Sequence, residues 1–107
     1  MSESLPRVFT DFTERYPQVA EAQGTLARVV RESTSFDEKT LHLVKLALAI
    51  GAQGKGEVRS AVRKGLNAGV TEEEMRSVAL LAITTCGFPT GIAGLGWIGD
   101  VCGADRA

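Results

Sequence analysis

Residues 36–71 of the chain read FDEKTLHLVKLALAIGAQGKGEVRSAVRKGLNAGVT, and the predicted fold is built around them. Its first part, up to Ile50, is almost wholly apolar beyond the first turn, a composition typical of a helix that is buried on every side. A glycine-rich elbow, Gly51–Gly56, follows. We therefore predict a helical hairpin whose first helix is central to the fold.

The second helix of the predicted hairpin, over 57–68, is amphipathic. Its apolar residues recur at the i, i+3, i+4, i+8 spacing of one helix face. They are Val58, Ala61, Val62 and Leu66. The basic residues lie off this face. Gly69 suits the left-handed position that commonly ends a helix, so we place the end of this helix just before it.

Four more helices are predicted, over 5–15, 17–32, 71–86 and 89–101. Pro17 separates the first two, because the residue before a proline is pushed out of the helical region. Ser35 and Thr71 each begin a Ser/Thr-x-x-Glu capping box, although Asp37 competes with Ser35 as N-cap. Strand patterns are nearly absent. The sequence thus predicts one all-α domain over 1–107, with about six helices around a central buried hairpin.

The inward faces of these helices also follow from the pattern. The helix over 17–32 is expected to bury Val19, Leu26, Val29 and Val30, and the helix over 71–86 to bury Met75, Val78, Ala79, Ala82, Ile83 and Cys86, widened by Leu80 and Leu81. The last helix contains four glycines, each of which costs roughly 1 kcal/mol relative to alanine. Close backbone packing against another helix is the simplest purpose for them.

Composition excludes several classes of partner. Twelve basic and thirteen acidic residues give a net charge of −1, which argues against nucleic acid or an anionic membrane. No uncharged apolar run reaches the 18 residues of a transmembrane helix. The first residues lack the apolar core of a signal peptide. Two widely spaced cysteines indicate free thiols, and we expect a cytoplasmic protein.

Two familiar motifs are rejected. Residues 94–99 match G-x-G-x-x-G, but no strand precedes them and only eight residues follow, so a dinucleotide site is excluded. Cys86 and Cys102 are too far apart for a C-x-x-C motif, and the chain has one histidine, so no zinc site is expected. No cofactor is predicted.

Three residues remain as candidates for chemistry. His42, the single histidine, lies one turn into the apolar helix and is either a core or interface residue or a catalytic acid–base group. Glu57 begins the basic helix, where it either stabilises the helix dipole or reacts. Arg59 belongs either to a solvated face or to an anion site.

The stretches FDEKTLHLVKLALAI and GEVRSAVRKGLNAGVTEEEMRSVALLAITTCGFP resemble the carboxymuconolactone decarboxylase and alkylhydroperoxidase D-like family. The matching features are the Asp-x-Lys-Thr helix start, the Ala-Gly-Val-Thr-Glu-Glu-Glu turn and the closing Gly-Phe-Pro. The resemblance covers about half of the chain. It implies an all-α fold and homo-oligomers, commonly trimers or hexamers.

The catalytic motif of the peroxidase members does not match. Those members carry Cys-x-x-Cys-x-x-x-His, whose positions are Gly54, Glu57 and Ala61 here, and a relay glutamate, whose position is His42. Without a thiol pair we expect no thiol peroxidase activity. Decarboxylase-type members have a glutamate followed four residues later by a histidine, a pattern that Glu57 fits and Ala61 does not.

The sequence therefore leaves two functions open. In the first, His42 and Glu57 form an acid–base couple that acts on a small carboxylate or lactone, and Arg59 steers the anion. In the second, the protein is a non-catalytic oligomeric scaffold or accessory protein that kept the fold and lost the site. In both cases self-association is the expected protein contact.

Overall fold

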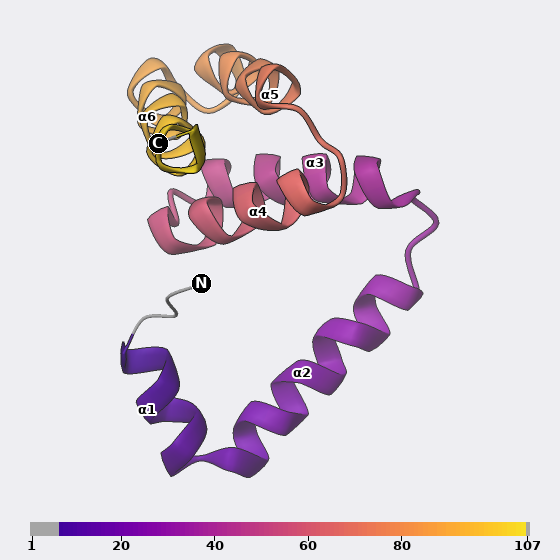
Figure 1. Cartoon of the computed structure of the whole chain (residues 1–107). Helices are drawn as coiled ribbons and strands as arrows, with labels where there is room; N and C mark the ends of the chain where they lie inside the picture. The colour runs from indigo at the N-terminus through magenta and orange to yellow at the C-terminus, as the bar shows by residue number, and fades with distance from the viewer. Residues whose placement is uncertain (1–6, 107) are drawn as a thin grey trace. The chain divides into compact units, whose positions relative to one another are not determined.

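The computed structural model describes residues 7–106, and the side chains of residues 7–103 (Figure 1). This part of the chain forms six helices and contains no strand, which confirms the all-α prediction. Two compact units are distinguished, residues 1–35 and residues 36–107. Within the described residues, no helix combines the length and the apolar content needed to span a bilayer.

The first unit contains α1 (Arg7–Arg15) and α2 (Pro17–Glu32). The boundary between them is as predicted, with Tyr16 as N-cap and Pro17 in the first turn of α2. The predicted burial of the apolar face of α2 was wrong for the single chain, since neither helix has a buried residue. An amphipathic helix is stabilised mainly by burying its apolar face, so these two helices need a further surface to cover them.

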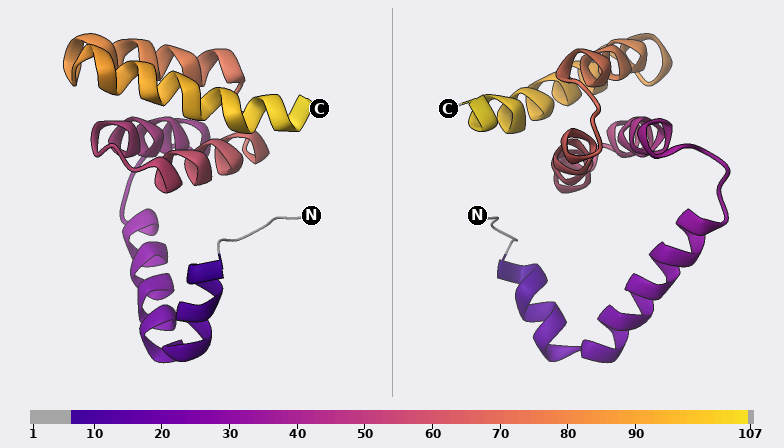
Figure 2. Two further views of the ribbon diagram at one scale, coloured as in Figure 1. Left: turned by 90° about the vertical axis from the view of Figure 1, so that its left-hand side faces the viewer. Right: turned by 45° about the vertical axis from the view of Figure 1, so that its right-hand side comes forward.

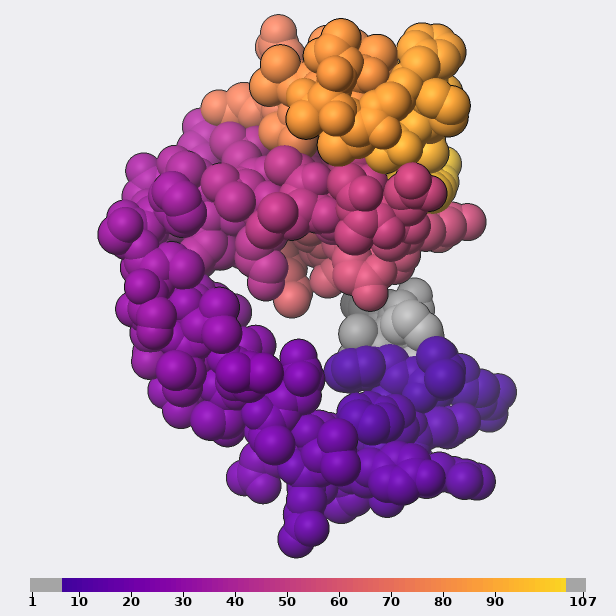
Figure 3. Space-filling model, turned by 180° about the vertical axis from the view of Figure 1, so that it is seen from behind, coloured from indigo at the N-terminus to yellow at the C-terminus, as the bar shows by residue number. Residues whose placement is uncertain are grey.

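The second unit has two layers of helices. The hairpin of α3 (Glu38–Gly51) and α4 (Lys55–Asn67) forms one layer, and the antiparallel pair α5 (Glu72–Thr85) and α6 (Phe88–Arg106) forms the other (Figure 2). Seen as spheres, the α5–α6 layer lies directly on the hairpin (Figure 3). Helix α6 continues five residues beyond the predicted end at Val101.

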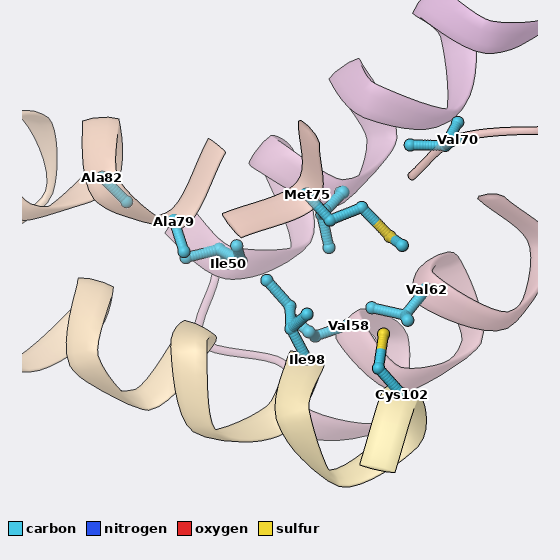
Figure 4. Packing of buried hydrophobic residues seen from close by; sticks show 10 residues of the cluster. Ile50, Val58, Val62, Val70, Met75, Ala79, Ala82, Ile98 and Cys102 are labelled. Carbon is cyan, nitrogen blue, oxygen red and sulfur yellow. The ribbon is translucent and has the colours of Figure 1, made fainter. Parts of the chain in front are cut away.

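The core lies between the two layers (Figure 4). It is built from Leu46, Ile50, Val58, Val62, Val70, Met75, Ala79, Ala82, Ile98 and Cys102. The predicted inward face of α4 is confirmed, because Val58 and Val62 are fully buried. The centre of the predicted inward face of α5 is confirmed, because Met75, Ala79 and Ala82 are buried. The buried face is narrower than predicted, since Leu80, Leu81 and Cys86 are exposed.

Helix α3 is not buried on every side in the single chain, and that prediction was wrong. Leu41, Leu46 and Ile50 are buried, whereas Leu48 on the opposite side is 68% exposed. One helix in a two-layer unit has only two or three neighbours, so an apolar composition on all faces leaves part of it uncovered. The outer face of α3 therefore stays available for a further contact.

The glycines of α6 divide into two groups. Gly91 and Gly94 are buried, and a Cβ atom there would meet Ile83 of α5 and Ile50 of α3 respectively. At these two positions the predicted close packing is confirmed. Among the described residues, nothing lies within 4 Å of a Cβ built at Gly96 or Gly99. Close packing within residues 36–107 does not explain these last two.

Candidate functional site

The start of α3 is held by Asp37. Its side chain accepts a hydrogen bond of 2.8 Å from the backbone N–H of Thr40, so Asp37 and not Ser35 is the N-cap. Hydrogen bonding by Thr40, first through its side chain and then through its backbone, lowers the pKa of the Asp37 carboxyl. This cap fixes the first turn of α3, one turn before the next candidate residue.

His42 lies one turn further along α3 and is largely enclosed. Its side chain is 11% exposed, and its Nε2 atom is 3.5 Å from Oε2 of Glu38. The Glu38 carboxylate is itself exposed to solvent. The arrangement is an imidazole sheltered on one side and facing a carboxylate, a combination that suits proton transfer.

The elbow closes α3 with a Schellman motif. The N–H of Gln53 donates to the carbonyl of Ile50, and the N–H of Gly54 donates to the carbonyl of Ala49. Gln53 occupies the left-handed position with φ of +59°, where glycine is usual. Its side-chain amide donates to the Thr90 hydroxyl at 3.3 Å, which ties the elbow to α6.

Glu57 lies in the first turn of α4, after the N-cap Gly54. Its carboxylate folds back over Gly54, so closely that a Cβ atom built at Gly54 would collide with Oε1 of Glu57. The carboxylate is exposed and lies at the positive end of the helix, where negative charge is favoured. Gly54 thus provides the space in which Glu57 sits.

Arg59 faces α6. One of its guanidinium nitrogens, Nη2, lies 4.0 Å from Oδ2 of Asp100, and both side chains are about half exposed. An exposed ion pair of this length stabilises a protein by less than about 1 kcal/mol, so it opens readily. An anionic ligand that binds Arg59 would therefore have to compete with Asp100 for its guanidinium group.

The structure gives His42 and Glu57 different neighbours. Among the described residues, no hydrogen bond or ion pair joins them. His42 lies nine residues before the end of α3, and Glu57 lies two residues after the start of α4. At about 1.5 Å of rise per residue, they are roughly 10 Å apart along the hairpin. Their direct cooperation in the assembled protein stays a prediction.

Sequence reasoning missed Glu38 as a neighbour of His42. The signal was present as Glu-x-x-x-His on a predicted helix, because residues four apart on a helix lie side by side. Asp100 was missed as well, and no local pattern links it to Arg59. Neither cysteine forms a disulfide; Cys86 is exposed and Cys102 is buried. Within the described residues, no cluster of three potential metal ligands was found.

Comparison with known proteins identifies one family. A model of the carboxymuconolactone decarboxylase family matches residues 17–100. The match begins at the start of α2 and reaches into α6, so it covers most of the chain and extends beyond the motifs of the hairpin. No curated protein and no solved structure matches the chain.

Proposed function

Because the chain belongs to the carboxymuconolactone decarboxylase family, we propose that it is a homo-oligomeric enzyme that moves a proton to or from carbon in a small carboxylate or lactone. The observation that carries the proposal is the enclosed His42 imidazole, 3.5 Å from the Glu38 carboxylate. His42 is the proposed catalytic acid–base group, and Glu38 positions it. Glu57 and Arg59, both on α4, are proposed to contact the substrate.

The chemistry follows from the residue types. An imidazole accepts a proton from carbon next to a lactone carbonyl, and the electron pair of that C–H bond moves onto the carbonyl oxygen. In a decarboxylation the C–C bond to the carboxylate breaks instead, its electron pair moves onto the carbonyl oxygen, CO₂ leaves, and an imidazolium donates a proton to the carbon. The first reaction needs a base and the second an acid, and a histidine side chain can be either, so His42 is the proposed group.

Glu57 and Arg59 are proposed to act on the substrate and not on His42. Glu57 is exposed in the first turn of α4, and Arg59 projects two residues later. A carboxylate substrate that displaces Asp100 from Arg59 gains a bidentate contact with the guanidinium.

The test is an assay of purified wild-type protein against small lactones and carboxylates, including a carboxymuconolactone. His42→Gln should lower the rate by at least about a hundredfold, since a positioned acid–base group typically contributes 10²–10⁴. Glu38→Gln should lower it less and change its pH dependence. Glu73→Gln, which removes an exposed acid in the first turn of α5, serves as the matched control and should leave the rate unchanged.

A specific observation also supports the scaffold alternative. The carboxylate of Glu57 is packed over Gly54, and the charge of Arg59 is already partnered by Asp100, so each group has a neighbour within the chain. A protein that assembles normally but neither turns over nor binds any compound of the panel would favour this function. Binding is measured as a rise in melting temperature, because a ligand of the native state stabilises it by mass action.

A further inference from the structure

Helix α6 carries an exposed face besides the face that packs within residues 36–107. Phe88, Ile92, Gly96, Gly99 and Gly103 recur at i, i+4, i+8, i+11, i+15, which places them along one face. The buried face of α6 is different and contains Gly91, Gly94, Ile98 and Cys102. Phe88 is 63% exposed and Ile92 is 45% exposed. We call the first set the outer α6 face.

The outer α6 face is uncharged, and its large side chains and its glycines lie at opposite ends. No charged residue occurs in Phe88–Gly99, which is unusual for a helix surface in water. The large side chains are at the N-terminal end, and the glycines are at the C-terminal end. Among the described residues, nothing lies within 4 Å of a Cβ built at Gly96, Gly99 or Gly103, so the glycine end is open.

From this order of sizes we propose that the outer α6 face pairs with the same face of a second copy, antiparallel and across a two-fold axis. In that pairing Phe88 of each copy lies against Gly103 of the other, and Ile92 lies against Gly99. Each large side chain thus fills the space over a glycine, as a two-fold interface requires of a self-complementary surface. The proposal rests on the proposed self-association and not on the proposed chemistry.

The apolar area fits a contact of this kind. Phe88 and Ile92 are the two large apolar side chains of the outer α6 face. With roughly 150–250 Å² for each large side chain, their exposed parts amount to about 200 Å² per copy. Two copies therefore bury about 400 Å² of these side chains, more than half of the apolar part of a stable interface of about 1,200 Å².

Other partners fit the face less well. A nucleic acid or an anionic surface needs positive charge, which the face lacks. A helix of another protein would need no particular order of large and small residues on α6, whereas pairing with a second copy needs the order that is present. The two-fold pairing also predicts dimers or larger assemblies that contain a two-fold axis, such as hexamers.

The first test is disulfide cross-linking in the full-length chain with Cys86→Ser and Cys102→Ala. Ile92→Cys combined with Gly99→Cys should give a covalent dimer on oxidation. Within one chain these positions are about 10 Å apart, beyond the roughly 7 Å limit for a disulfide, so the cross-link must join two copies. Ile92→Cys by itself should not cross-link. Dimers from Ile92→Cys, or none from the double variant, would overturn the antiparallel pairing.

The second test measures self-association by sedimentation equilibrium. Gly99→Leu fills the open space and should weaken the association at least tenfold, whereas Gly56→Leu, at an equally open glycine of α4, should not. Adding Ile92→Ala to Gly99→Leu should recover part of the lost association.

A wild-type monomer or a closed trimer, which has no two-fold axis, would refute the pairing, as would normal association of Gly99→Leu. Catalytic turnover is not a readout of these tests, so their failure leaves the proposed chemistry to be judged by its own assay.

Discussion

At the residue scale, two helix ends with the same motif carry different residues. Both α3 and α4 end in a Schellman motif, with Gln53 at the left-handed position of the first and Gly69, with φ of +91°, at that of the second. A non-glycine residue in this conformation costs roughly 1 kcal/mol. The chain tolerates that cost at the elbow, where the Gln53 side chain also bonds to Thr90.

Gln53→Gly should therefore raise the free energy of unfolding, by about 0.5 kcal/mol after the loss of the exposed Thr90 hydrogen bond is subtracted. Urea denaturation measures the change. Gly69→Ala, the matched substitution at the other helix end, should lower the free energy of unfolding by about 1 kcal/mol. If Gln53→Gly destabilised the protein as much as Gly69→Ala does, the Gln53 side chain would stabilise the elbow by more than its left-handed backbone costs.

The loss of folding stability at acidic pH should depend on Glu74. The backbone N–H of Thr71, and then Lys39 with Nζ 3.0 Å from Oε2, lower the pKa of the Glu74 carboxyl. A carboxyl with a lower pKa in the folded state adds stability above its unfolded pKa, near 4.3, and loses it as the pH falls through the folded value. Glu74→Gln should flatten the loss of stability between about pH 5 and pH 3.

Chemical denaturation at several pH values checks this. Glu73→Gln is the control, because the side chain of Glu73 makes no hydrogen bond or ion pair among the described residues. A pH dependence that is the same in Glu74→Gln and in the wild-type protein would contradict the assignment.

At the element scale, the close approach of α5 and α6 depends on Gly91. A Cβ atom there would collide with the Ile83 side chain and lie 2.9 Å from the Ile83 nitrogen and 3.0 Å from the Ala79 carbonyl oxygen. Backbone atoms cannot move aside as a flexible side chain can, so Gly91→Ala should destabilise the protein by about 1–3 kcal/mol. Thermal or urea unfolding measures this. Gly56→Ala, at an open glycine in α4, should be neutral or stabilising, and an equally neutral Gly91→Ala would refute close packing at this point.

The capping box of α5 gives a second prediction for an element. The Thr71 hydroxyl accepts from the Glu74 N–H at 3.1 Å, and the Glu74 carboxylate accepts from the Thr71 N–H at 2.9 Å. Thr71→Ala removes the first of these bonds and should cost about 1 kcal/mol of stability. Thr71→Ser keeps the hydroxyl and should cost much less. Equal losses in the two variants would mean that the methyl group of Thr71, and not the cap, matters.

At the scale of the whole molecule, the sequence predicted local structure better than burial. The helix boundaries at Pro17, Asp37 and Thr71 follow from proline and capping chemistry, which acts within a few residues. The outward positions of Leu48, Leu80 and Leu81 were not predictable, because an apolar side chain does not reveal whether its neighbour is in the same chain or in another.

In the candidate site, too, local contacts were predictable and contacts between helices were not. The enclosed position of His42 on α3 was within reach of the sequence, and the Glu38 contact was visible as a four-residue spacing. The contact of Arg59 with Asp100 joins residues from α4 and α6, and only the packing of those helices determines it. Sequence reasoning therefore found the titratable groups but missed the Glu38 contact of His42, and the pairing of His42 with Glu57 stays a prediction.

The central claim is that His42 moves a proton at carbon, and the most direct measurement is hydrogen–deuterium exchange in the substrate. A carboxymuconolactone, or another lactone that binds, is incubated in D₂O with the assembled protein, and deuterium next to the carbonyl is followed by NMR. We predict that the wild-type protein speeds incorporation and that His42→Gln removes the effect while the fold and the oligomer persist. Equal incorporation with His42→Gln and wild type would contradict the claim.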